Sequence, residues 1–155
     1  MIVGFVKAEP QGDRTLASAH SKQLSRDFGW RAPCGNLPAA YLTGLLAGLR
    51  AKASGIAEAI LDAGVKKPTK GSRIYAALKG VVDAGIEVPH DPSVFPEEGR
   101  IRGEHIADYA KLLSQNPPQY ERQFSQYLRA GLRPEDLPSH FEEVRAKLLG
   151  AFGAA

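Results

Sequence analysis

The feature that most constrains the fold of this chain is a change of hydrophobic periodicity at Pro38. Before it, the apolar, β-branched residues 1–8 and the alternating residues 15–19 are separated by turn-forming residues at 9–13. This pattern predicts a β-hairpin. After Pro38, apolar residues recur at helical spacing, at Tyr41, Leu42, Leu45, Leu46 and Leu49. A hairpin and an apolar helix in one chain favour layers of sheet and helix.

A strand and a second helix are expected next. The first long helix should end near Ser54, and it carries Gly44 and Gly48 on a face that is able to approach a sheet closely. The short apolar segment 57–61 is expected to be a parallel strand reached by a crossover connection. Ser72 is expected to cap the following helix. That helix has an apolar face made of Ile74, Ala77, Leu78, Val81 and Val82.

The other segments are expected to be loops and further helices. Two stretches rich in glycine or proline read as loops, at 29–36 and 89–96. Helical patterns and proline starts predict four more helices, at 21–28, 103–114, 117–130 and 138–149.

Two regions are expected, an α/β domain over 1–115 and a helical C-terminal extension over 116–155 that packs on it. The apolar residues of the extension recur at helical spacing and are expected to form packing contacts rather than a ligand site. They are Tyr120, Phe124, Tyr127, Leu128, Phe141, Val144 and Leu148.

Cysteine and histidine usage argues against a metal site. Cys34 is the only cysteine, so neither an internal disulfide nor a cysteine-based zinc site is possible. The four histidines lie far apart in the sequence, at His20, His90, His105 and His140. No apolar run approaches the length of a membrane span, and the N-terminus does not resemble a signal peptide. We therefore expect a soluble, cytoplasmic protein with no cofactor, no membrane partner and no small-molecule substrate.

Known catalytic motifs do not fit the chain. The sequence Lys70-Gly71-Ser72-Arg73 lacks the order of a phosphate-binding P-loop, and no Gly-x-Ser-x-Gly motif of serine hydrolases is present. A small metal-dependent nuclease with a ribonuclease H-like fold remains an alternative, because Asp13 and Asp62 flank predicted strands. Turn or capping roles explain both carboxylates more simply.

The distribution of charge points to one loop. The formal net charge is +3, but residues 1–93 hold 12 Lys and Arg against 8 Asp and Glu, whereas residues 94–155 hold 8 against 9. Lys66, Lys67, Lys70 and Arg73 lie in a stretch without acids that leads through Ser72 into a predicted helix. The amides at a helix N-terminus attract anions, so this loop suits a phosphate. The alternative is a basic loop that is merely solvated.

Two further sets of residues are candidate RNA contacts. The first is spread over the hairpin exit and the loop after it, and includes Arg14, Lys22, Arg26, Arg31 and Asn36. Trp30 lies in the same loop, where its indole would either stack on an unpaired base or pack in the core. The second set is Arg100 and Arg102, close to His105 and just before a predicted helix.

The chain closely resembles archaeal members of the family of large-subunit ribosomal protein eighteen, which binds 5S rRNA. The resemblance runs in order from about residue 2 to the C-terminus. It is carried by GDRTLASAH (12–20), DFGW (27–30), CGN (34–36), AILD (59–62), LKG (78–80), DAG (83–85), VPH (88–90) and RIRGEHI (100–106).

This resemblance implies a three-layer α/β fold with a small mixed sheet of ribonuclease H-like topology and no catalysis. It implies that the partners are 5S rRNA, 23S rRNA and neighbouring proteins of the large subunit, with the protein located on the ribosome. In bacterial relatives, the loop that matches residues 64–73 contacts 5S rRNA, and Arg73 aligns with a family arginine.

One departure from the family concerns the N-terminus. Family members usually begin with a basic tail and a first strand, whereas this chain starts at what resembles their second strand. We therefore expect a basic N-terminal segment upstream, whose strand would pair with residues 2–6.

A third interpretation of the chain is a protein-binding module that uses the C-terminal helices.

Overall fold

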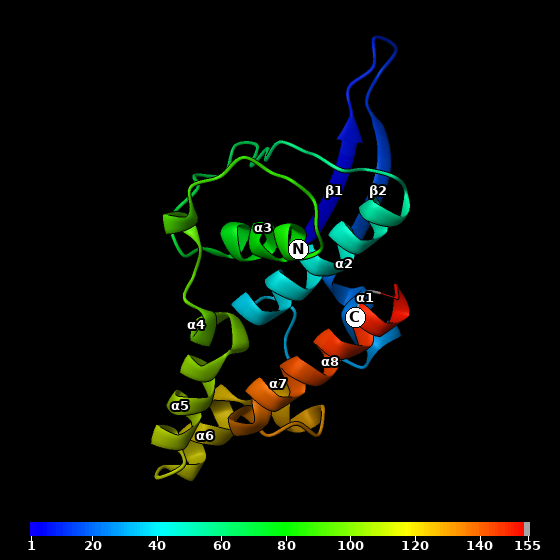
Figure 1. Cartoon of the computed structure of the whole chain (residues 1–155). Helices are drawn as coiled ribbons and strands as arrows, with labels where there is room; N and C mark the ends of the chain where they lie inside the picture. Colours follow the sequence, from blue (N-terminus) through cyan, green and yellow to red (C-terminus); the bar gives the residue numbers. More distant parts are fainter. Residues whose placement is uncertain (154–155) are drawn as a thin grey trace.

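The computed structural model describes residues 1–153, and it begins with the predicted hairpin. Strand β1 (Ile2–Lys7) pairs antiparallel with β2 (Arg14–His20), from Ile2 opposite His20 to Lys7 opposite Arg14. A bulge between Phe5 and Val6 shifts the register and bends the ribbon. The hairpin projects from the helical body, and its turn lies far from the helices (Figure 1).

Helix α1 (Ser21–Phe28) follows β2 directly and confirms the helix predicted there. His20 begins it, because its Nδ1 accepts a hydrogen bond from the Lys22 amide at 3.0 Å. The Gln23 side chain accepts one from the His20 amide at 2.9 Å, which completes a capping box. Gly29, at φ 75°, ends the helix in the left-handed conformation that glycine adopts without strain.

Helix α2 (Leu37–Ala53) is the centre of the molecule, and every residue from Leu37 to Leu49 is buried. It is contacted by the hairpin, α1, α3 (Arg73–Asp83), α4 (Glu98–Arg102) and α8 (Leu137–Ala151). A helix that is apolar on all sides belongs in such an interior. Asn36 caps it, accepting the Ala39 amide with its Oδ1 at 2.9 Å.

Helix α3 (Arg73–Asp83) packs against α2 through glycines. A Cβ on Gly44 would overlap the carbonyl oxygen of Ala77, and a Cβ on Gly80 would overlap that of Tyr41. A Cβ on Gly48 would come within 2.6 Å of the Ala84 Cβ. The expectation that Gly44 and Gly48 face a sheet was therefore wrong, because both face a second helix.

The strand expected at 57–61 does not form. The segment makes one isolated parallel bridge, Glu58 with Glu87, supported by backbone hydrogen bonds of 2.9 Å on either side. Ile60 is 88% exposed, so the apolar run is not a core strand. The segment stops at Asp62, whose Oδ1 accepts the Gly64 amide at 2.7 Å and turns the backbone. The fold is mixed α/β, and its regular sheet within residues 1–153 has two antiparallel strands.

The C-terminal half is helical, with more breaks than the sequence suggested. A short helix, α4, precedes the predicted one, since Gly103 at φ 87° separates it from α5. The single helix expected over 117–130 is two, because Phe124 leaves helical geometry between them. The elements are η1 (Pro92–Val94), α4 (Glu98–Arg102), α5 (Glu104–Leu113), α6 (Pro117–Gln123), α7 (Ser125–Arg129), η2 (Pro134–Asp136) and α8 (Leu137–Ala151).

Helix α8 contacts α2 and contributes side chains to the same core. Phe141, Val144 and Leu148 are at most 2% exposed, so the predicted packing role of these side chains is confirmed. Leu128 is the exposed one among the residues predicted to pack, with 40% of its surface exposed. Among the helices of residues 1–153, none combines the length and the apolarity needed to cross a bilayer.

Candidate nucleic-acid interface

The basic loop 64–73 is fastened at its end to two other loops. The Gly71 amide donates to the Val94 carbonyl at 2.9 Å, and Lys70 Nζ donates to Ser93 Oγ at 3.2 Å. Arg73 Nη1 donates to the Gly35 carbonyl at 2.9 Å, although the two residues are 38 positions apart. Lys66 and Lys67 lie on the part of the loop before these anchors and are exposed.

Ser72 occupies the cap position of α3 but does not cap it with its side chain. The expected cap was therefore wrong: Ser72 Oγ is buried and has no hydrogen-bond partner within the described residues. The first amides of α3 consequently receive no side-chain acceptor. Unpaired amides at the positive end of a helix, next to exposed lysines, are a favourable place for a phosphate.

Asn36 and Trp30 are engaged inside the protein. Besides capping α2, Asn36 donates from Nδ2 to the Tyr127 hydroxyl at 3.3 Å, so both ends of its amide are occupied. Trp30 is 2% exposed and stacks on His140, with ring centroids 5.2 Å apart. The core role of Trp30 is thus confirmed, and stacking on an RNA base is excluded by its burial.

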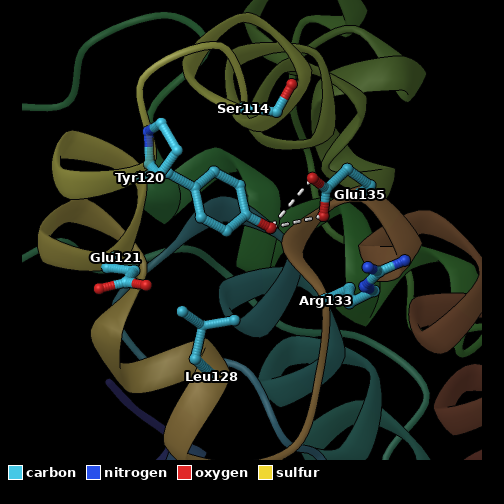
Figure 2. Close-up of a pocket in the computed structure, with 7 residues that line it drawn as sticks. Ser114, Tyr120, Glu121, Leu128, Arg133 and Glu135 are labelled. Atoms are coloured by element: carbon cyan, nitrogen blue, oxygen red, sulfur yellow. Dashed lines mark hydrogen bonds between the residues drawn. The ribbon is translucent and has the colours of Figure 1, made fainter.

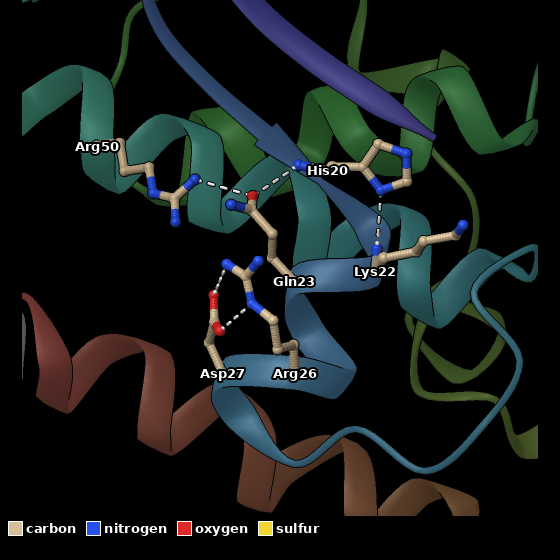
Figure 3. A network of polar contacts seen from close by, with 6 residues as sticks. All are labelled: His20, Lys22, Gln23, Arg26, Asp27 and Arg50. Atoms are coloured by element: carbon tan, nitrogen blue, oxygen red, sulfur yellow. Dashed lines mark hydrogen bonds and ion pairs between the residues drawn. The ribbon is translucent and has the colours of Figure 1, made fainter.

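The two cations of α1 differ in whether their side chains are paired with a carboxylate (Figure 3). Arg26 forms two hydrogen bonds to Asp27, at 2.6 and 3.0 Å, and this pairing lowers the pKa of the Asp27 carboxyl. Lys22 is exposed, and only its backbone takes part in the cap of the helix. Arg50, which sequence reasoning missed, donates to the Ser18 carbonyl at 2.7 Å and to Gln23 Oε1 at 3.0 Å.

Arg14 and Arg31 lie on different parts of the N-terminal region. Arg14 lies on the hairpin, and Arg31 lies in the loop that follows α1. Arg14 is exposed at the start of β2, opposite Lys7, which pairs with Glu9 at 3.4 Å. Arg31 Nη1 donates to the Gly131 carbonyl at 3.4 Å. The hairpin tip therefore carries two neighbouring cations, of which the sequence singled out only one.

Arg100 and Arg102 both lie on α4 but have different surroundings. Arg102 pairs with Glu142 at 3.4 Å and with Glu98 at 3.9 Å. Arg100 is exposed and has no ion pair among residues 1–153. Burial lowers the pKa of His105, and the nearby charge of Arg100 lowers it further.

The structure therefore brings only some of the predicted residues together. Lys70, Ser72 and Arg73 gather with Gly35 and Ser93 around the start of α3. The cations of α1, of α4 and of the hairpin tip are attached to separate elements. Contacts such as the one from Arg73 to Gly35 leave no local signal in the sequence, because they join loops far apart in the chain.

A hollow of about 330 Å³ lies among the C-terminal helices, lined by Ser114, Pro117, Tyr120, Glu121, Leu128, Arg133 and Glu135. The Tyr120 hydroxyl donates to both carboxylate oxygens of Glu135, at 3.0 and 2.8 Å (Figure 2). Burial, helped by this carboxylate, raises the pKa of Tyr120 to about 12. Two carboxylates against one guanidinium make the hollow a poor phosphate site.

The carboxylates proposed for a nuclease do not form a metal site. Asp62 is used in the turn with Gly64, as a structural role requires. Within the described part of the chain, no three His, Cys, Asp or Glu side chains are placed to hold a metal ion together.

Comparison with known proteins gives consistent matches. A family model described as ribosomal large subunit proteins 60S L5 and 50S L18 matches residues 51–91, a segment that contains the basic loop. Large ribosomal subunit protein uL18 of Aeropyrum pernix is 52% identical over 151 residues, which cover 97% of this chain and 71% of the relative. The uL18 protein of Ignicoccus hospitalis is 53% identical over 148 residues, which cover 95% of this chain and 72% of the relative.

Proposed function

From its membership in the uL18 family of large ribosomal subunit proteins, to which this chain belongs, we propose that it binds 5S rRNA and helps attach it to 23S rRNA. Its role is that of a structural constituent of the large subunit, located in the central protuberance, with neighbouring ribosomal proteins as further partners. It is not an enzyme, since the family is a structural component of the ribosome. The nuclease alternative has no support from the relatives.

The observation that carries the proposal is the position of the basic loop. The loop lies inside the segment that matches the family model. Lys66 and Lys67 are exposed on it, while Lys70 and Arg73 hold its end against neighbouring loops. Exposed cations on a held loop suit the phosphate backbone of RNA, which supplies most of the affinity of such complexes.

The other predicted RNA contacts fall into two groups, exposed side chains and side chains that are already bonded within the protein. Lys22, Arg14 and Arg100 are exposed and are proposed to meet RNA directly. Those already bonded within the protein would position the surface as well as touch it. They are Arg26, Arg31, Asn36 and Arg102. Ser72, whose buried hydroxyl has no partner within the described residues, lies at the start of α3 and is proposed to meet RNA there.

The three-layer, ribonuclease H-like arrangement of the family is also part of the proposal. It is supported by the position of α2 between the hairpin and α3 and by the parallel bridge of Glu58 with Glu87. The division at residue 115 into an α/β domain and a packed extension is proposed on the same basis. A structure of the chain bound to 5S rRNA tests both.

Salt dependence of binding tests the function. Binding that neutralises several phosphates releases counterions, so affinity for 5S rRNA should fall by about 10³- to 10⁵-fold between about 50 and 200 mM salt if six or more contacts form. Filter binding with labelled 5S rRNA measures this. An affinity that does not change with salt, or 5S rRNA that is cleaved when magnesium is added, would contradict the proposal.

A further inference from the structure

A second hollow, of about 320 Å³, opens between α5 and the α6–α7 pair. Its walls are His105, Ile106, Tyr109, Gln123, Phe124 and Tyr127. Apart from Ile106, each of these side chains has an aromatic ring or an amide group. Neither a carboxylate nor an ammonium group lines it, so it differs in chemistry from the hollow at Tyr120 and Glu135.

Two of the rings, those of Phe124 and Tyr127, are buried at the bottom of the hollow, and a third, that of Tyr109, is partly exposed. Phe124 is 3% exposed and Tyr127 is 7% exposed, and their rings meet edge to face with centroids 5.7 Å apart. The Tyr127 hydroxyl is held by Asn36. Tyr109 stands against Phe124 at 6.1 Å, yet 46% of Tyr109 is exposed. The ring of Tyr109 therefore presents surface to a ligand from a supported position.

The polar groups of the hollow, Gln123 and His105, are neutral, and each can both donate and accept a hydrogen bond. Gln123 offers an amide donor and an amide acceptor. Burial and then the charge of Arg100 lower the pKa of His105, so near pH 7 its imidazole is uncharged. A neutral imidazole donates from one ring nitrogen and accepts at the other. Such a pair matches the edge of a heterocycle rather than an ion.

A positive charge lies close to this neutral pair. Arg100 is near enough to His105 to affect its pKa, and it is exposed without an acidic partner in the described residues. An unpaired nucleotide has a flat ring, an edge of donors and acceptors, and a phosphate. The hollow offers a counterpart to each of these three parts, whereas an apolar protein side chain would use only the rings.

We propose that this hollow receives one unpaired base of ribosomal RNA, with its ring against Tyr109, its edge toward His105 and Gln123, and its phosphate toward Arg100. The inference rests on the proposed function, because it assumes that the chain binds rRNA. It adds a contact with a base, on elements separate from the basic loop.

Three substitutions of Tyr109 in the full chain test the proposal, with 5S rRNA and 23S rRNA assayed separately. Stacking of a base on an aromatic ring contributes about 1–3 kcal/mol. Tyr109→Ala should therefore weaken binding to one of the two RNAs by about 5- to 150-fold. Tyr109→Phe keeps the ring and should bind like the parent, while Tyr109→Leu should be as weak as the alanine variant.

Leu112→Ala is the matched control, because Leu112 is 65% exposed on the same helix and does not line the hollow. It should bind RNA like the parent. Retained binding by Tyr109→Leu alongside weakened binding by Tyr109→Ala would show an apolar contact and overturn the base site. Unchanged binding in all three Tyr109 variants would also overturn it, and a parent protein that binds neither RNA would refute the proposed function itself.

Discussion

At Gly80 the packing of the two central helices depends on a residue without a side chain. Any Cβ there would overlap the Tyr41 carbonyl and lie 2.6 Å from the Leu45 amide nitrogen, both of which belong to the backbone of α2. Backbone cannot rotate away as a side chain can. We predict that Gly80→Ala lowers the free energy of unfolding by about 1–3 kcal/mol, even though alanine has the higher helix propensity. Urea denaturation measures the change.

Gly150 provides the control for this prediction. It lies in α8, and a Cβ there would have no atom within 4 Å. Gly150→Ala should raise the free energy of unfolding by up to about 1 kcal/mol, since only helix propensity changes. If both variants are stabilised, the α2–α3 contact is not as close as the structure has it.

His140 is the residue expected to make stability depend on pH. It is 4% exposed, it stacks on Trp30, and its Nε2 accepts the Arg31 amide at 3.0 Å. Burial is the main cause that lowers its pKa, and the charges of Arg31 and Lys147 add to this effect, while Glu143 opposes it. The native state therefore binds fewer protons than the unfolded state as pH falls below about 6.5, the ordinary pKa of histidine.

The contribution of His140 to the free energy of unfolding should consequently be complete above about pH 6.5 and should decline as the pH falls below that value. The free energy of unfolding, measured by denaturant at several pH values, tests this. His140→Gln should be less stable at pH 7.5 but should show a flatter decline below pH 6.5. His105→Gln is the comparison variant, because burial also lowers the pKa of His105. Its unfolding free energy below pH 6.5 shows how much of the decline comes from His105 rather than from His140. A decline of equal steepness in the parent and in His140→Gln would contradict the assignment.

Among the elements, the basic loop separates charge from anchoring. Lys66 and Lys67 are exposed, whereas Arg73 holds the Gly35 carbonyl. Lys66→Ala with Lys67→Ala should weaken 5S rRNA binding and reduce the magnitude of the log–log salt slope by about 0.7 to 0.9 for each phosphate that is no longer neutralised. Stability should stay within about 0.5 kcal/mol of the parent. Filter binding and thermal unfolding give the two readouts.

Arg73→Ala should differ, with a decrease in stability of about 0.5–1.5 kcal/mol in addition to weaker RNA binding, because a hydrogen bond between loops is removed. Lys111→Ala is the control, because it removes a cation whose ion pair with Asp108 lies within α5 and joins no loops. It should bind RNA and unfold like the parent. A Lys66 and Lys67 double variant that binds 5S rRNA as tightly as the parent would show that the loop is only solvated.

The elements also show what the sequence could predict. The hairpin, α1, α2 and α8 follow from local patterns of apolar residues, turns and caps, and all four are confirmed. Segment 57–61 has the composition of a strand, but a strand forms only with neighbours, and it finds a single bridge to Glu87. The break at Phe124 has a similar origin, because the backbone of Phe124 leaves helical geometry while its ring contacts Tyr109, Tyr120 and Tyr127.

The candidate site was predictable only in part for the same reason. Exposed cations such as Lys66 can be recognised from charge and turn composition alone. The engagement of Asn36 with Tyr127, and that of Arg102 with Glu142, depends on tertiary contacts between distant segments. No local pattern distinguishes a cation that is free from one that is paired across the fold.

For the whole molecule, the C-terminal helices are part of the core. Phe141 packs on Tyr41 with ring centroids 5.6 Å apart, and His140 covers Trp30. We predict that a fragment ending at residue 115 does not unfold cooperatively, because it would expose the faces of α1 and α2 that α8 covers. Thermal unfolding followed by circular dichroism measures this. A fragment with a sharp transition and native-like spectra would show instead that residues 1–115 fold independently.

The anchoring of the basic loop affects the thermodynamics of its encounter with RNA. Ordering the backbone of one residue costs about 1–2 kcal/mol in conformational entropy. Gly71, Lys70 and Arg73 are already fixed by hydrogen bonds to Val94, Ser93 and Gly35, so this entropy decreases during folding rather than during association. Lys66 and Lys67 are exposed earlier in the same loop, where the Lys66 amide donates to the Ala63 carbonyl at 3.3 Å. The loop therefore meets its partner as a preorganised surface, and association should show the modest heat-capacity change of rigid docking rather than the large one of coupled folding.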